Sequence, residues 1–129
     1  MIKEIYKILV VEDDKMMQEV LVTRLSKEPI FKVYIANNGK EGLVSVLANN
    51  PDLILLDVIM PVMDGIQMFK ELRKSFWSKN IPVIFLTSYD TSEEVLQSIS
   101  EEKPAYYLLK STMNLNDIVE KIKVTLGIK

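Results

Sequence analysis

The sequence predicts an α/β fold in which helices cover both faces of an open parallel β-sheet. Five short apolar runs alternate with segments whose apolar residues recur at helical spacing. Most of the apolar runs are continuous, which is typical of strands that are buried on both faces of a parallel sheet. The chain has 129 residues, the length of one domain, and right-handed crossovers are expected between its strands.

The predicted strands are rich in aliphatic, β-branched and aromatic residues. They are ILVV (8–11), VYIA (33–36), LILL (53–56), VIFL (83–86) and AYYLL (105–109). Because these strands are expected to be parallel, their carboxyl ends should all meet at one edge of the sheet. That edge is therefore the place to look for a functional site.

The five predicted helices each have one apolar stripe at a spacing of three or four residues. The stripes are Met17, Val20, Leu21 and Leu25; Leu43, Val46 and Leu47; Met68, Phe69, Leu72 and Phe76; Val95, Leu96 and Ile99; and Leu115, Ile118, Val119, Ile122 and Leu126. Asp14 is a candidate N-cap of the first helix, and TSEE at 91–94 has the pattern of a capping box. Gly127 stands where the last helix is expected to end.

Composition excludes several kinds of site. The chain contains no cysteine and no histidine, so disulfides, thiolate nucleophiles and the usual zinc ligands are excluded. Any metal must therefore be bound by oxygen. The net charge of −2 and the mixing of acids with bases give no basic stripe for nucleic acid. The apolar run at the N-terminus is too short for a signal peptide or a membrane span, so we expect a cytoplasmic protein without membrane association.

Charged and hydroxyl residues stand at the ends of four predicted strands. Asp57 directly follows LILL, the most apolar strand, although removing a carboxylate from water costs several kcal/mol without a partner. The partners are expected from the other strand ends, where the sequence has Glu12-Asp13-Asp14, Thr87 and Lys110. The position of Asp14 is explained by capping of the helix and by the helix dipole, whereas neither effect explains the positions of Glu12 and Asp13.

The chemistry of these residue types indicates a phosphoryl-transfer site. Carboxylates within about 5 Å of one another repel, so that one must hold a proton unless a cation lies among them. A hard divalent cation fits oxygen ligands, and Mg²⁺ fits better than Ca²⁺ because there are too few carboxylates for a calcium cage. A lysine and a hydroxyl donor beside Asp57 suit a transferring phosphoryl group, with Asp57 as the nucleophile that forms an acyl phosphate.

From about Lys7 to Gly127 the chain resembles the receiver domain of bacterial two-component response regulators. The segment DVIMPVMDG (57–65) resembles the family loop D-x-x-M-P-x-M-D-G, in which the first aspartate is the phosphoacceptor. The resemblance implies a single receiver domain over 1–129, without an effector domain in this chain. It also implies a flavodoxin-like, doubly wound fold with five strands in the order 2-1-3-4-5.

The resemblance also implies roles for individual residues. Mg²⁺, for which Mn²⁺ could substitute, would be bound by Asp13, by Glu12 through water, by Asp57 and by the backbone carbonyl of Ile59. Thr87 and Lys110 would contact the phosphoryl group of Asp57. Thr87 and Tyr107 would form the conformational switch, with Tyr106 as a competing candidate for the aromatic position. Ile59 and Tyr89 would flank the phosphoryl group and slow its hydrolysis, because both are bulky and largely apolar.

The function implied is a phosphorylation-dependent signalling switch. A sensor histidine kinase or a phosphotransfer protein would donate the phosphoryl group from a phosphohistidine. The surface formed by the fourth helix, the fifth strand and the fifth helix would then change and control a partner or formation of a homodimer. Such a protein assists its own phosphorylation and dephosphorylation but is not otherwise an enzyme. The alternative is an interaction domain of the same fold that is never phosphorylated.

Some residues depart from the family pattern. Ser111 follows Lys110 where the family usually has a proline in a cis bond. A cis bond before a residue other than proline costs about 2.5–4 kcal/mol, so we expect the Lys110–Ser111 bond to be trans. An aspartyl-phosphate phosphatase is disfavoured, because such enzymes usually have a second acid two residues after the nucleophile, where this chain has Ile59.

Overall fold

The computed structural model describes residues 3–88, 93–94, 97, 101 and 103–128. Its elements follow in the order β1 (Tyr6–Val11), α1 (Lys15–Leu25), β2 (Phe31–Ala36), α2 (Gly39–Asn49), β3 (Leu53–Asp57), α3 (Gly65–Lys74), β4 (Val83–Thr87), β5 (Tyr106–Leu109) and α5 (Leu115–Leu126). Each of the five predicted strands is present, with bounds that differ from the predicted ones by no more than two residues.

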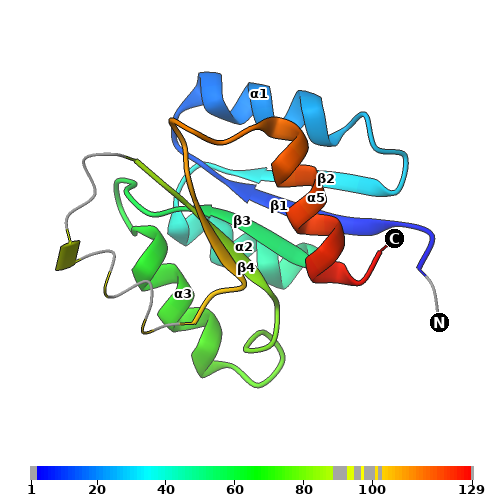
Figure 1. The fold of residues 1–129 in the computed structure, drawn as a ribbon. Coiled ribbons are helices and arrows are strands. Elements are labelled where there is room, and N and C mark those ends of the chain that lie inside the picture. The colour runs from blue at the N-terminus through cyan, green and yellow to red at the C-terminus, as the bar shows by residue number, and fades with distance from the viewer. Residues whose placement is uncertain (1–2, 89–92, 95–96, 98–100, 102, 129) are drawn as a thin grey trace.

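The strands form one parallel sheet in the order β2-β1-β3-β4-β5, as predicted. β1 and β3 lie near the centre, and their aliphatic residues are fully buried, whereas Tyr6 at the start of β1 is half-buried. Figure 1 shows α1 and α5 on one side of this sheet and α3 on the other. The sheet is therefore the middle layer of a three-layer α/β/α sandwich.

Each face of the sheet has its own apolar core. Alternate residues of β1 and β3, such as Leu9 and Leu56, pack with Val46 of α2 and Phe69 of α3. The residues between them, such as Ile8 and Leu55, pack with Leu21 and Leu25 of α1 and with Ile118, Val119 and Ile122 of α5. Because side chains alternate across a strand, a continuous apolar run supplies both cores, which explains the pattern seen in the sequence.

The predicted fourth helix cannot be compared with the structure in full. Val95, Leu96 and Ile99, which form its stripe, lie outside the described residues, as do Thr91 and Ser92 of the capping box. Glu93, Glu94 and Gln97 are helical. The described part of the chain therefore has four complete helices where five were predicted.

Three residues assigned to the buried stripes are exposed, which corrects the predicted helix faces. The exposed fractions are 41% for Val20, 68% for Leu47 and 85% for Phe76. α1 buries the predicted Leu21 and Leu25 but has Gln18 on its inner face where Val20 was predicted, so that face is rotated from the predicted one. α3 ends at Lys74, and its C-cap Ser75 is extended, which places Phe76 beyond the helix.

Glycines explain why Leu47 is not on the inner face of α2. That face consists of Gly39, Gly42 and Val46. A Cβ atom on Gly42 would lie 2.7 Å from the sulfur of Met68 and 3.2 Å from a methyl group of Val11. The absence of a side chain thus lets α2 approach α3 and the sheet closely, so its contact face has small residues rather than large ones.

Helix ends follow the sequence signals. The side chain of Asp14 accepts hydrogen bonds from the backbone N–H groups of Met16 and Met17, and Asp64 accepts one from Gln67 at the start of α3. Gly127 adopts a left-handed conformation, with φ of 74°, at the end of α5.

The Lys110–Ser111 bond is trans, as expected. No helix among the described residues is long and apolar enough to cross a bilayer.

Candidate functional site

Strand register brings the four predicted site segments to one edge of the sheet. Val11 is level with Leu56, Asp57 with Leu86, and Thr87 with Leu109. The backbone N–H of Lys110 donates to the carbonyl of Thr87 at 2.7 Å, which extends the β4–β5 ladder by one residue. The residues that follow β1, β3, β4 and β5 are thus neighbours although they lie far apart in the sequence.

Three acids meet at this edge. Glu12, Asp13 and Asp57 each offer a carboxylate oxygen, and these oxygens lie within 4.8 Å of one another. Glu12 is fully buried and Asp57 is 4% exposed, whereas Asp13 is exposed to solvent. Two buried carboxylates and one at the surface thus form a compact acidic cluster at the carboxyl edge of the sheet.

Lys110 balances part of this charge. Its Nζ atom lies 2.9 Å from Oε2 of Glu12 and 3.1 Å from Oδ1 of Asp57. Burial disfavours the charged ammonium, but the hydrogen bond to Glu12 and the charge of Asp57 outweigh this effect and raise the pKa of Lys110. The ammonium of Lys110 therefore keeps its positive charge. The cluster then contains one positive charge and three carboxylates, two of which contact the lysine.

The protonation of Asp57 reflects this imbalance. Burial, and then the charge of Glu12, raises the pKa of Asp57 from 3.8 to about 7, although Lys110 acts in the opposite direction. Near neutral pH the carboxyl therefore exchanges a proton readily. A cation bound by the acidic cluster would compete with that proton, so cation binding is expected to become tighter as the pH rises.

The donor set fits a small hard cation. Oε2 of Glu12 is buried, and the Lys110 ammonium lies 2.9 Å from it. Lys110 supplies one positive charge beside three carboxylates, so the cluster still has an excess of negative charge. Three carboxylates, one of them exposed, suit Mg²⁺, which prefers few protein ligands and retains water. The residues of the cluster therefore fit the predicted metal.

Thr87 is fully buried at the end of β4, next to Asp57 in the sheet. Its hydroxyl donates to the carbonyl oxygen of Leu108 in β5, at 3.3 Å, so it is engaged with β5. The adjacent Tyr107 is 52% exposed and Tyr106 is half-buried. Thr87 thus links the carboxylate edge to the strand that contains both candidate switch tyrosines.

The loop after Asp57 is tightly constrained. A Cβ atom on Gly65 would lie 2.2 Å from the backbone oxygen of Asp57, so only glycine allows the loop to return this closely. The N–H of Gly65 donates to the carbonyl of Val58 at 2.8 Å. Val62 has φ of 70°, an unfavourable value for a β-branched residue. Ile59, on the same loop, is 54% exposed.

The predicted site residues thus have different outcomes. The structure brings together the carboxylates of Glu12, Asp13 and Asp57. The ammonium of Lys110 forms ion pairs with Glu12 and Asp57. Metal ligation by the backbone carbonyl of Ile59 stays a prediction. Tyr89 lies outside the described residues.

Neither Gly65 nor Gln18 has a role among the predicted site residues. Gly65 could have been found as the final glycine of the loop motif, directly before which the helix-capping Asp64 stands. The burial of Gln18 has no local sequence signal, because the acceptors that its side chain uses lie in the loops after β1 and β2.

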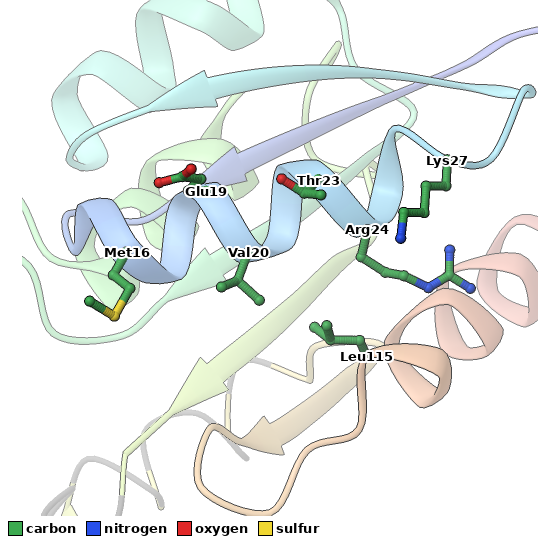
Figure 2. Close-up of a pocket in the computed structure, with 7 residues that line it drawn as sticks. All are labelled: Met16, Glu19, Val20, Thr23, Arg24, Lys27 and Leu115. Atoms are coloured by element: carbon green, nitrogen blue, oxygen red, sulfur yellow. The ribbon is translucent and has the colours of Figure 1, made fainter.

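A hollow of about 320 Å³ lies near this edge, between α1 and the start of α5. In Figure 2 the side chains of Val20 and Arg24 extend from α1 toward Leu115. None of the acids or the lysine of the site lines it, but Met16, which does, is three residues after Asp13. Met16 is 76% exposed, so this surface offers apolar contacts beside the carboxylates.

Comparison with known proteins identifies relatives over almost the whole chain. The family model described as "Response regulator receiver domain" matches residues 8–123. A Francisella response regulator receiver domain is 30% identical, with 95% of this chain and 97% of that chain covered and a TM-score of 0.81. A receiver domain of a histidine kinase from Syntrophus aciditrophicus is 27% identical, with 95% and 90% covered and a TM-score of 0.86. A Vibrio cholerae chemotaxis protein is 26% identical, with 93% and 98% covered and a TM-score of 0.81.

Proposed function

Since the chain belongs to the response regulator receiver domain family, we propose that it is a signalling switch that is phosphorylated on Asp57. The observation that carries this proposal is the contact of a buried Asp57 carboxylate with Lys110, at 3.1 Å, beside two further acids. A buried carboxylate with a raised pKa and a fixed cation next to it is suited to act as a nucleophile on a phosphoryl group.

The donor is a phosphohistidine on a sensor histidine kinase or a phosphotransfer protein. An oxygen of Asp57 attacks the phosphorus atom while the phosphorus–nitrogen bond breaks. The electron pair of that bond remains on the imidazole, which takes up a proton from solvent. The hollow between α1 and α5 supports docking of the donor beside the acids, because it exposes apolar side chains such as Met16 close to Asp13.

Lys110 and Thr87 would contact the transferred group. The ammonium of Lys110 already contacts the carboxylate of Asp57, so it can pair with a phosphoryl oxygen after a small movement. The Thr87 hydroxyl can donate to another oxygen once it releases the Leu108 carbonyl. Mg²⁺ bound by Asp13, Asp57, the carbonyl of Ile59 and, through water, Glu12 would neutralise charge on the phosphoryl oxygens, and Mn²⁺ could substitute.

The same movement of Thr87 would transmit the signal. When its hydroxyl leaves the carbonyl of Leu108, β5 loses one contact and the space behind Thr87 changes. Tyr107, which is exposed, could then turn inward and alter the surface formed by β5, α5 and the predicted fourth helix. That surface would bind a downstream partner or a second copy of the chain. Such a switch needs only two alternative packings of the same fold, whose populations are shifted by the new contacts to the phosphoryl group.

The phosphorylated state is expected to be long-lived. Ile59 exposes an apolar side chain on the loop that follows Asp57, where it would hinder an attacking water molecule. Tyr89 was predicted to act in the same way from the other side of the phosphoryl group.

Phosphorylation by phosphoramidate, a small donor with a phosphorus–nitrogen bond, tests this function. With Mg²⁺ present the parent protein should gain one phosphoryl group by intact mass spectrometry, and Asp57→Asn should gain none. Asp64→Asn is a matched control, because Asp64 lies in the same loop and asparagine caps a helix as well as aspartate does. Equal phosphorylation of Asp57→Asn would refute the site, and a parent chain that gains no phosphoryl group would favour the unphosphorylated interaction domain.

A further inference from the structure

Gln18 is a buried polar residue for which the proposed phosphoryl transfer has no role. It lies on the inner face of α1, is 7% exposed, and shares that face with Leu21 and Leu25. An apolar residue at this position would pack against the sheet without any desolvation cost. The presence of an amide at this place therefore calls for polar partners that make its burial favourable.

Those partners lie in two loops at the functional edge of the sheet. The Nε2 atom of Gln18 donates to the backbone carbonyl of Glu12 at 2.7 Å and to Oδ1 of Asn37 at 3.0 Å. An amide nitrogen has two hydrogens, so both are used. Gln18 thus joins the loop that follows β1 to the loop that follows β2.

The contact with Glu12 fixes a peptide group within the acid cluster. The backbone N–H of Glu12 donates to the carbonyl of Ala36 in β2 at 3.1 Å, and its carbonyl accepts from Gln18. The N–H of Glu12 belongs to the peptide before this residue and its carbonyl to the peptide between Glu12 and Asp13, so the bond to Gln18 is the one that fixes the second peptide. That peptide determines the directions in which the carboxylates of Glu12 and Asp13 leave the chain.

Asn37 is held in turn by its neighbours. Its Oδ1 atom also accepts from Nζ of Lys15 at 2.5 Å, and its Nδ2 atom donates to Oε1 of Glu41 at 3.0 Å. Lys15 begins α1 and Glu41 lies in the first turn of α2. The anchor for Gln18 is therefore tied to the starts of two helices.

We propose that Gln18 is a positioning residue that sets the orientation of the Glu12 and Asp13 carboxylates for Mg²⁺. The inference rests on the proposed function, in which these acids bind the metal. Removing a group that orients a metal ligand through a hydrogen bond typically lowers the metal affinity about 10–100-fold. Gln18 acts through the Glu12 backbone and does not itself contact the metal or the phosphoryl group.

Gln18→Met tests this role because methionine has nearly the same volume and no donor. Mg²⁺ binding is measured by titration calorimetry, and stability by urea unfolding in EDTA. We expect Gln18→Met to weaken Mg²⁺ binding by about tenfold, at the lower end of the range for such groups. Asn37→Ala removes the second acceptor of Gln18, together with the side-chain bonds of Asn37 to Lys15 and Glu41, but leaves the bond from Gln18 to Glu12, so it should weaken Mg²⁺ binding less. Gln67→Met, the same change on the exposed face of α3, should leave Mg²⁺ affinity unchanged.

The outcomes separate this inference from the proposed function. If Gln18→Met is less stable but binds Mg²⁺ as tightly as the parent, Gln18 is only structural and the inference is wrong. If Gln18→Met fails to fold, Asn37→Ala decides, and unchanged Mg²⁺ affinity in that variant would overturn the inference. If the parent itself binds no Mg²⁺, both the metal in the proposed function and this inference are wrong. Loss of affinity in both variants, with the Gln67→Met control unaffected, supports the inference.

Discussion

The raised pKa of Asp57 predicts that its negative charge destabilises the metal-free protein. A carboxyl whose pKa is higher in the folded than in the unfolded chain holds its proton more tightly when folded. Its contribution to stability is therefore complete below pH 3.8, the unfolded value, and is lost as the pH rises through about 7. Asp57→Asn removes this charge and should make the metal-free protein more stable above neutral pH.

The two pKa values give the size of the effect. Their difference is about 3 units, and each unit corresponds to about 1.4 kcal/mol, so the charge of Asp57 costs at most about 4 kcal/mol at pH 8. This net cost already includes the attraction to Lys110, which lowers the pKa of Asp57. Because asparagine is neutral like the protonated carboxyl, we expect Asp57→Asn to raise the free energy of unfolding by up to about 4 kcal/mol at pH 8. Since folded Asp57 is largely protonated at pH 5, the gain there should be roughly half as large.

Urea unfolding followed by circular dichroism in EDTA measures this difference at both pH values. Glu120→Gln, which makes a similar acid-to-amide change on the exposed surface of α5, should change stability by no more than about 0.5 kcal/mol. Addition of Mg²⁺ should stabilise the parent more than Asp57→Asn and so narrow the gap. The reasoning is refuted if Asp57→Asn is no more stable than the parent at pH 8. It is also refuted if the gain is the same at pH 5.

Three other variants, one of them a double substitution, test separate parts of the site. Lys110→Met leaves the buried acids without their cation, so stability in EDTA should fall by roughly 3 kcal/mol in urea unfolding, and an unchanged stability would contradict the proposed balance of charges. Gly65→Ala places a methyl group 2.2 Å from the Asp57 carbonyl oxygen and should cost more than about 2 kcal/mol in thermal unfolding; a cost near zero would show that the loop can move. Ile59→Asn combined with Tyr89→Ala should shorten the lifetime of the phosphorylated protein, measured by its decay after donor removal, whereas an equal or longer lifetime would exclude steric shielding.

Much of the fold and the acid cluster could be predicted because both follow from strand position. A continuous apolar run predicts a strand buried on both faces, and parallel strands bring their carboxyl ends to one edge. Asp57, Glu12 and Lys110 could therefore be placed together although they lie far apart in the sequence. That step needed only the order of elements and no detail of side-chain packing.

The inner faces of the helices were harder to predict. Counting large apolar residues placed Leu47 on the inner face of α2, but close packing there requires small residues such as Gly42. The same counting passed over Gln18, because its burial depends on acceptors from the loops after β1 and β2 that no local pattern shows. Contacts between distant loops set these positions, so local periodicity alone could not find them.

The most direct test of the account is to locate the phosphoryl group chemically. Borohydride reduces an acyl phosphate of aspartate to homoserine, and peptide mass spectrometry then identifies the reduced position. After reaction with phosphoramidate and Mg²⁺, we expect reduction at residue 57 and at no other acid of the cluster. Reduction at Asp13, or at none of the three acids, would contradict the claim that Asp57 is the nucleophile.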